Sequence, residues 1–108
     1  MRDPDHLAWL ANWYGLQCDG DWEHQDGIRI ETLDNPGWMV TVSLTGTELE
    51  ARAFTATGSG ETMGGDGDPK TRWHDCQVAS GEFRGACGVF DLGRVLGIFR
   101  DWAESRPG

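Results

Sequence analysis

The sequence predicts an α+β fold, in which an antiparallel β-sheet of four or five strands is bracketed by an N-terminal and a C-terminal helix. Apolar residues recur at helical spacing before residue 17 and after residue 92, and they alternate with polar residues in short runs between residues 28 and 79. Turn signals separate these runs, as is typical of antiparallel hairpins. We expect both helices to pack on one face of the sheet and residues 1–108 to form a single domain.

The two helices are predicted by apolar stripes and by residues suited to helix starts. The first is expected over residues 4–17, with Asp3 as N-cap and Pro4 at the first helical position, where a missing N–H costs nothing. The second is expected over residues 92–104, after the N-cap Asp91. The apolar stripe of the first comprises Leu7, Leu10, Trp13, Tyr14 and Leu16. That of the second comprises Leu92, Val95, Leu96, Phe99 and Trp102.

Alternation predicts strands over residues 28–32, 38–44, 49–55 and 71–79, the first three forming a meander. A short edge strand at residues 83–87 is a weaker prediction, because glycine disfavours strand interiors. Residues 57–69 are rich in glycine and are expected to form a mobile loop. The turn between the first two strands is predicted by Asp34, Asn35, Pro36 and Gly37.

The composition restricts the classes of partner. Nine basic residues against 18 acidic ones give a net charge of −9, which argues against nucleic acid and anionic membranes as ligands. A basic protein partner, or simply solubility, accounts for the acidity. No apolar stretch is long enough to span a bilayer, and the three cysteines contain no C-x-x-C pair. We therefore expect a cytoplasmic protein with reduced thiols.

The densest group of polar residues lies between residues 18 and 26, where acids, a histidine and a tryptophan crowd together. Such acids could do acid–base chemistry or bind Ca²⁺, but the remaining EF-hand ligands are missing from their positions. They could also hold the loop through its backbone, with Trp22 anchored in the core, or face a partner. The expected partner-binding residues are Asp19, Asp21, Trp22, Glu23, His24, Asp26, Glu48 and Glu50.

Two chemical alternatives remain open. Zinc-type ligands occur at Cys18, His24, His74 and Cys76, but their spacing is looser than in closed structural sites, so we expect no metal. Cys76 lies between His74 and Asp75, which resembles a nucleophile with a base, although Asp75 would point to the other face of a strand. A small enzyme using Cys76 or Cys18 is thus an alternative. We assign no catalytic residue and expect no cofactor.

Residues 9–44 resemble the immunity protein 53 family, which comprises small bacterial antidote proteins encoded next to polymorphic toxins. The resemblance is weaker in the Gly-rich middle and returns around Trp73, residues 83–88 and residues 96–102. The residues that match the family pattern are Trp13, Cys18, Asp19, Gly20, Asp21, Trp22, Glu23, His24, Gly27, Leu33, Asp34, Asn35, Pro36, Gly37 and Trp38. The resemblance implies a protein that binds a cognate toxin and neutralises it stoichiometrically, without catalysis.

A motif shared across a family is expected to hold the fold, since the surface that selects the toxin varies among immunity proteins. The expected structural residues are Trp13, Cys18, Gly20, Asp34, Asn35, Pro36, Gly37, Trp38 and Trp102. Rival contact surfaces are therefore the Gly/Asp-rich loop and an exposed sheet face carrying Glu48, Glu50 and Arg52. The oligomeric state is not predicted by the sequence.

Overall fold

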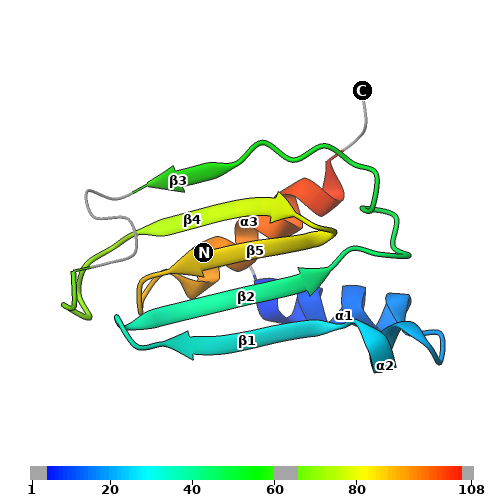
Figure 1. The fold of residues 1–108 in the computed structure, drawn as a ribbon, viewed down its shortest axis with the longest axis horizontal. Coiled ribbons are helices and arrows are strands. Elements are labelled where there is room, and N and C mark those ends of the chain that lie inside the picture. The colour runs from blue at the N-terminus through cyan, green and yellow to red at the C-terminus, as the bar shows by residue number, and fades with distance from the viewer. Residues whose placement is uncertain (1–4, 60–65, 106–108) are drawn as a thin grey trace.

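A computed structural model describes residues 5–59 and 66–105 of the chain. It confirms the predicted α+β class, with a five-stranded antiparallel sheet and a long helix at each end (Figure 1). In chain order the elements are α1 (His6–Gln17), α2 (Trp22–Gln25), β1 (Ile28–Leu33), β2 (Gly37–Ser43), β3 (Thr57–Ser59), β4 (His74–Ala79), β5 (Glu82–Cys87) and α3 (Leu92–Glu104).

The strand order in the sheet is β1-β2-β5-β4-β3, and each strand runs antiparallel to its neighbours. The meander expected from three successive strands is wrong, because β2 pairs with β5 rather than with the next segment of the chain. Strand β5 therefore lies at the centre, where Gly85 is opposite Val40 on one side and Cys76 on the other.

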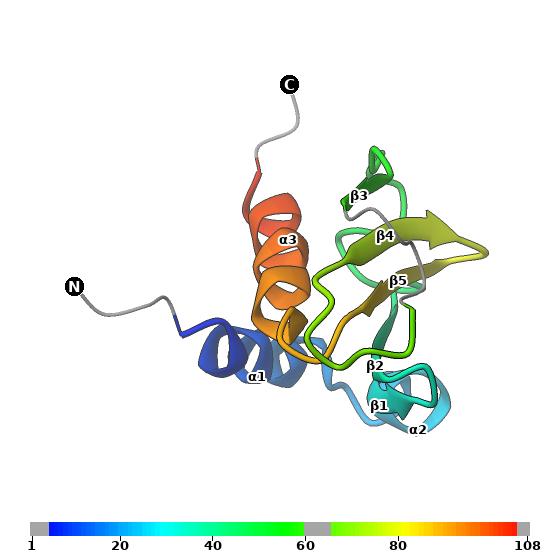
Figure 2. The same cartoon turned by 90° about the vertical axis from the view of Figure 1, so that its left-hand side faces the viewer.

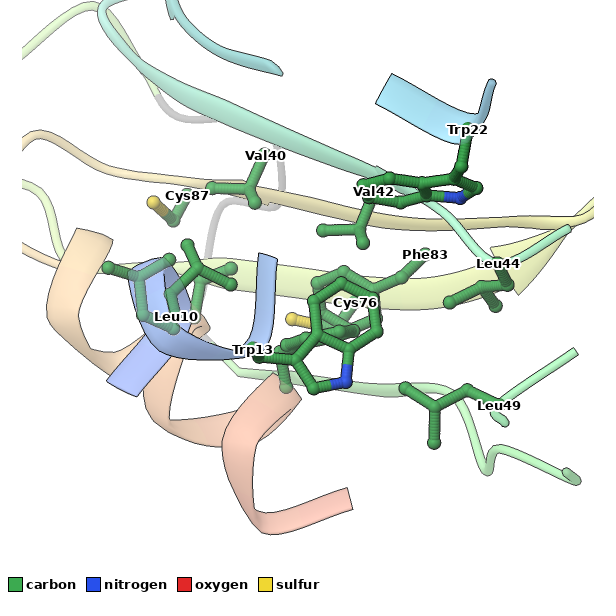
Figure 3. Packing of buried hydrophobic residues seen from close by; sticks show 13 residues of the cluster. Leu10, Trp13, Trp22, Val40, Val42, Leu44, Leu49, Cys76, Phe83 and Cys87 are labelled. Carbon is green, nitrogen blue, oxygen red and sulfur yellow. The ribbon is translucent and has the colours of Figure 1, made fainter. Parts of the chain in front are cut away.

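Both long helices cover the same face of the sheet, as predicted (Figure 2). Alternate residues of the strands point toward them, including Val40, Val42, Cys76 and Phe83, which are fully buried (Figure 3). Phe99 of α3 packs on this layer, with its ring centroid 5.0 Å from that of Phe83. The core thus lies between the sheet and α3, and α1 closes it from the side.

The strand predicted at residues 49–55 is wrong. This segment forms turns in which Thr47 donates its hydroxyl to the carbonyl of Leu44 at 2.8 Å and accepts the N–H of Leu49 at 3.1 Å. Leu49 is fully buried and Phe54 packs against the core. The apolar side chains of this segment pack on the core, and their alternation with polar residues does not reflect a strand.

The strand at residues 83–87 is central rather than an edge, and glycine is the reason. A Cβ atom at Gly85 would clash with a methyl group of Val95, so only glycine lets α3 approach the sheet this closely. Strand β3 falls inside the segment expected to be a loop. Residues 60–65 of that segment lie outside the described residues, as do Asp3 and Pro4.

The helix ends are held by side chains. Asp5 caps α1 by accepting the N–H of Ala8 at 2.9 Å. At the C-terminal end of α3, Nη1 of Arg52 donates to the carbonyls of Trp102 and Ala103 at 3.1 and 3.0 Å, and also to that of Ser105. A cation at these carbonyls balances the negative end of the α3 dipole.

Candidate functional site

Residues 18–26, here called the acidic loop, connect α1 to β1 and contain the short helix α2. Two of its acids fold the loop itself. The carboxylate of Asp19 accepts the N–H groups of Asp21 and Trp22 at 2.9 and 3.0 Å. That of Glu23 accepts those of Asp19 and Gly20 at 3.0 and 2.9 Å. Gly20 has a φ of 98°, a conformation that favours glycine.

These hydrogen bonds keep both carboxylates charged. The N–H of Trp22, followed by that of Asp21, lowers the pKa of Asp19. The pKa of Glu23 is lowered first by its own N–H and then by those of Asp19 and Gly20. Loss of either charge would release loop N–H groups, so these two acids stabilise the loop.

Three further polar side chains of the acidic loop are unengaged. Asp21, His24 and Asp26 are exposed, and none makes a side-chain hydrogen bond or ion pair with the described residues. A partner could bind them without disrupting any internal interaction.

Trp22 is not available to a partner. Only 5% of the residue is exposed, and its ring lies 6.1 Å from that of Trp13 and 5.6 Å from that of Tyr14. The expected contact role for Trp22 is therefore corrected: it anchors the acidic loop in the core, the alternative that the sequence left open.

Glu48 and Glu50 lie outside the sheet, because the segment that carries them is not a strand. The carboxylate of Glu48 accepts the indole N–H of Trp13 at 2.9 Å and the amide of Gln17 at 3.0 Å. That of Glu50 accepts the N–H of Gly46 at 3.2 Å. Glu48, Glu50 and Arg52 therefore do not lie on an exposed face of the sheet, contrary to the expectation, and Glu48 links α1 to the turns after β2.

Beside the acidic loop, an apolar groove runs between α1 and β1, which the sequence analysis missed. It has a volume of about 250 Å³. It is lined by Leu7, Leu10, Ala11, Tyr14 and Ile28. Leu7 and Tyr14 are 62% and 37% exposed, although both belong to the apolar stripe that predicts this helix. Apolar residues on several sides of α1, including Leu16 at 76% exposure, were the available signal.

The groove is connected to the acidic loop through two of its lining residues. Tyr14 contacts the buried Trp22 of the loop, and Ile28 is separated from the loop by Gly27 alone. Asp26 lines a separate pocket together with Arg29, Thr41 and Glu82.

The remaining motif residues occupy tight or packed places. A Cβ at Gly37 would clash with the carbonyl of Cys87, and Trp38 donates its indole N–H to the carbonyl of Val89 at 3.1 Å. Trp13 is buried, and Trp102 donates to the carbonyl of Ala53 at 2.8 Å. Asp34 is exposed in the turn after β1, and the peptide between Asn35 and Pro36 is cis.

The proposed zinc ligands do not converge. Cys18 and His24 lie in the acidic loop, and His74 begins β4 at the opposite end of the sheet (Figure 1). Within residues 5–59 and 66–105, no group of three or more His, Cys, Asp and Glu side chains could hold a metal ion.

The buried thiols are poor nucleophiles. Burial raises the pKa of Cys76 to about 12 and that of Cys87 to about 11, so both stay protonated at neutral pH. Asp75 and His74 occupy opposite faces of β4, as the register requires. Cys18 is exposed and donates its S–H to the carbonyl of Tyr14 at 3.3 Å.

Comparison with known families gives a match to the model described as immunity protein 53, over residues 7–104. No curated protein and no solved structure matches the chain. In the described part of the chain, no helix has the length and apolar character needed to cross a bilayer.

Proposed function

The chain belongs to the immunity protein 53 family, and from this membership we propose that it binds a cognate toxin domain and blocks it stoichiometrically, without catalysis. The toxin would belong to a bacterial polymorphic toxin system, and the immunity protein would act as one domain in the cytoplasm. The single observation that supports a binding role is the exposed apolar groove on α1, the helix that leads into the acidic loop with its unengaged acids.

The groove has the composition of an interface centre. Protein interfaces combine a desolvated apolar core with a polar rim, and Leu7 and Tyr14 supply the first while Asp21 and Asp26 supply the second. Aromatic residues such as Tyr14 are enriched among those that dominate binding energy. We propose that the toxin contacts this combined surface.

Charge favours a basic toxin. The chain carries a net charge of −9, and Asp21 and Asp26 form no ion pair with any residue in the described ranges. A complementary partner would be steered toward them, so association should slow as salt shortens the Debye length from about 30 Å at 0.01 M to about 8 Å at 0.15 M.

The decisive test is co-expression with the toxin encoded beside this protein, followed by size-exclusion chromatography of the pair. We expect growth to be rescued and a stable complex to be recovered. If growth is not rescued and no complex is recovered, the immunity role is rejected. The alternative hypothesis, an enzyme that uses Cys18 or Cys76, would then be favoured.

The surface is tested by matched variants measured by binding kinetics. Asp21→Lys with Asp26→Lys should lower the association rate at low salt, whereas Asp101→Lys, at an exposed position of α3, should have a smaller effect. Leu7→Asp should weaken affinity by about tenfold or more, and Leu16→Asp should leave it unchanged. Equal effects within each pair would show that the toxin binds elsewhere.

A further inference from the structure

Strand β1 is an edge strand, and among the described strands only β2 pairs with it (Figure 1). Proteins usually protect such an edge by keeping it short or by placing a bulge or a proline in it. The opposite edge strand, β3, comprises three described residues. Strand β1 has six residues in an unbroken register with β2, and none of them is proline. Its outer edge is therefore suited to pairing with another strand.

The backbone groups that face this open edge can be identified from the ladder. The N–H of Ser43 donates to the carbonyl of Gly27 at 3.0 Å, and these residues are opposite each other when the register of β1 and β2 is continued. Hydrogen-bonded pairs alternate with non-hydrogen-bonded pairs in an antiparallel ladder, so the odd-numbered residues of β1 bond to β2. The N–H and C=O groups of Ile28, Ile30 and Thr32 therefore point toward the open edge.

The side chains of β1 divide between the two faces of the sheet. Ile28 and Ile30 are opposite Val42 and Val40, which are fully buried under the helices, so these isoleucines lie on the helix side. Ile28 lines the apolar groove beside α1, and Ile30 is 37% exposed. A strand added to the open edge would therefore place its own alternate side chains at the groove.

The other face of β1 carries two charges of opposite sign. Arg29 and Glu31 are exposed, and neither forms an ion pair with any residue in the described ranges. Glu82, which lines a pocket with Arg29, is paired with Arg84 at 2.9 Å instead. Arg29 and Glu31 thus remain available to a partner strand that presents the opposite charges in the same order.

A second copy of β1 presents these charges in one antiparallel register. Pairing centred on Ile30 places Arg29 of each copy opposite Glu31 of the other, in a non-hydrogen-bonded pair, where facing side chains come closest. Pairing centred on Arg29 or on Glu31 would instead place like charges opposite each other. The register centred on Ile30 also places the open backbone groups of Ile28 opposite those of Thr32.

We propose that two copies of this chain associate through β1 in the register centred on Ile30, so that their two sheets become one. Such a two-fold interface uses the same residues on both sides, as is usual in homodimers. Neighbouring antiparallel strands keep the helices of both copies on one side of the joint sheet, so the two grooves meet and Leu7 and Tyr14 are shielded from water. If the toxin binds this groove as proposed, it competes with the second copy.

The test is sedimentation velocity of the isolated full chain at about 0.15 M salt, where the repulsion between two copies of net charge −9 is screened. We expect a monomer–dimer equilibrium that shifts toward the dimer as protein concentration rises. Arg29→Glu and Glu31→Arg should each weaken association about tenfold, because each places like charges opposite each other at two symmetric positions. The double variant Arg29→Glu, Glu31→Arg restores opposite charges and should dimerise as the wild type does.

Two further variants serve as controls. Arg94→Glu makes the same change of net charge as Arg29→Glu, at an exposed position of α3, and should leave the dimer intact. Thr32→Pro removes an N–H that faces the open edge and none that bonds to β2. It should abolish the dimer while the far-ultraviolet circular dichroism spectrum of the monomer stays unchanged.

Three results would overturn the proposal. A monomer at every concentration would leave the toxin as the occupant of the groove. A dimer that neither single charge reversal weakens would be formed through another surface. Failure of the double reversal to restore association would show that Arg29 and Glu31 do not pair. Since no toxin is present in these measurements, each of these results leaves the proposed immunity function standing.

Discussion

The two long helices differ in how much of their apolar surface the fold uses. In α3, Val95, Leu96 and Phe99 are buried against the sheet. In α1, Leu10 and Trp13 are buried, whereas Leu7 and Leu16 remain largely exposed. Folding therefore accounts for the sequence of α3 but not for all of α1, and the excess apolar surface on α1 is available to a partner.

The cause of the difference is position over the sheet. Helix α3 lies on the central strand, where Gly85 lets Val95 come close. Helix α1 packs mainly against α3 and lies beside the edge strand β1, whose Ile30 is still 37% exposed (Figure 2). An edge strand has a neighbour on one side only, so a single helix leaves a groove there.

The largest expected effect is at the centre of α3. Phe99→Ala should lower the free energy of unfolding by about 3–5 kcal/mol, because the fully buried ring contacts Trp13 and Phe83 and would leave a cavity. Urea denaturation measures the change. A loss below about 1 kcal/mol would contradict the conclusion that α3 uses more of its apolar surface in the core than α1 does.

A smaller effect is expected at the start of α3. Asp91→Asn should cost about 1–3 kcal/mol at neutral pH by breaking the pair with Arg72. Burial raises the pKa of Asp91, but the bonds from Arg72 and from the N–H of Trp73 lower it more, so the net shift is downward.

The sign of that shift fixes the pH dependence. The stabilisation by Asp91 should be complete above the ordinary carboxyl pKa of about 4 and should be lost as the pH falls through the lower folded value. Acid denaturation of Asp91→Asn should therefore be less steep than that of the wild type. If acid denaturation is equally steep for Asp91→Asn and the wild type, Asp91 does not contribute to the pH dependence of stability in this way.

At the end of α1, Glu48→Ala should cost about 1 kcal/mol, because it leaves the indole N–H of Trp13 without its acceptor. Glu31→Ala removes an exposed acid that has no hydrogen bond or ion pair among the described residues, and is the matched control. Equal thermal midpoints for the two variants would contradict a stabilising role for Glu48.

The smallest effects on stability are expected on the outer faces of α1. Leu7→Ser and Leu16→Ser should each change the free energy of unfolding by no more than about 0.5 kcal/mol, since both side chains are largely exposed. Only Leu7→Ser should weaken the toxin complex. A marked loss of stability for Leu7→Ser would mean that the groove is part of the core.

Local patterns predicted most of the fold. The helical stripe of α3 and the turn before β2 were readable because each depends on neighbours in the chain. Leu49 and Phe54 were misread because apolar residues alternate both in strands and in turns that pack on a core. The central place of β5 depends on the fit between Gly85 and Val95, which no local pattern reveals.

The candidate site was predictable only in part. The cluster of acids indicated the right loop, but local patterns do not distinguish two of them. The carboxylate of Asp19 binds backbone N–H groups, whereas that of Asp21 makes no hydrogen bond with any described residue. Glu48 meets Trp13 across 35 residues of chain, and such a pair has no local signature. The groove on α1 was not predicted, because helical periodicity shows that an apolar stripe exists but not which of its residues the rest of the fold covers.

The sheet order also determines when the strands can pair during synthesis on the ribosome. Strand β5 is the last strand to be synthesised and the one that joins β2 to β4. Until residue 87 has left the exit tunnel, both neighbours have unpaired edges, which are the features through which chains associate wrongly. The hydrogen bonds of Arg52 likewise cannot form until the carbonyls of residues 102–105 have been synthesised. The five-stranded sheet therefore cannot be completed before β5 has been synthesised.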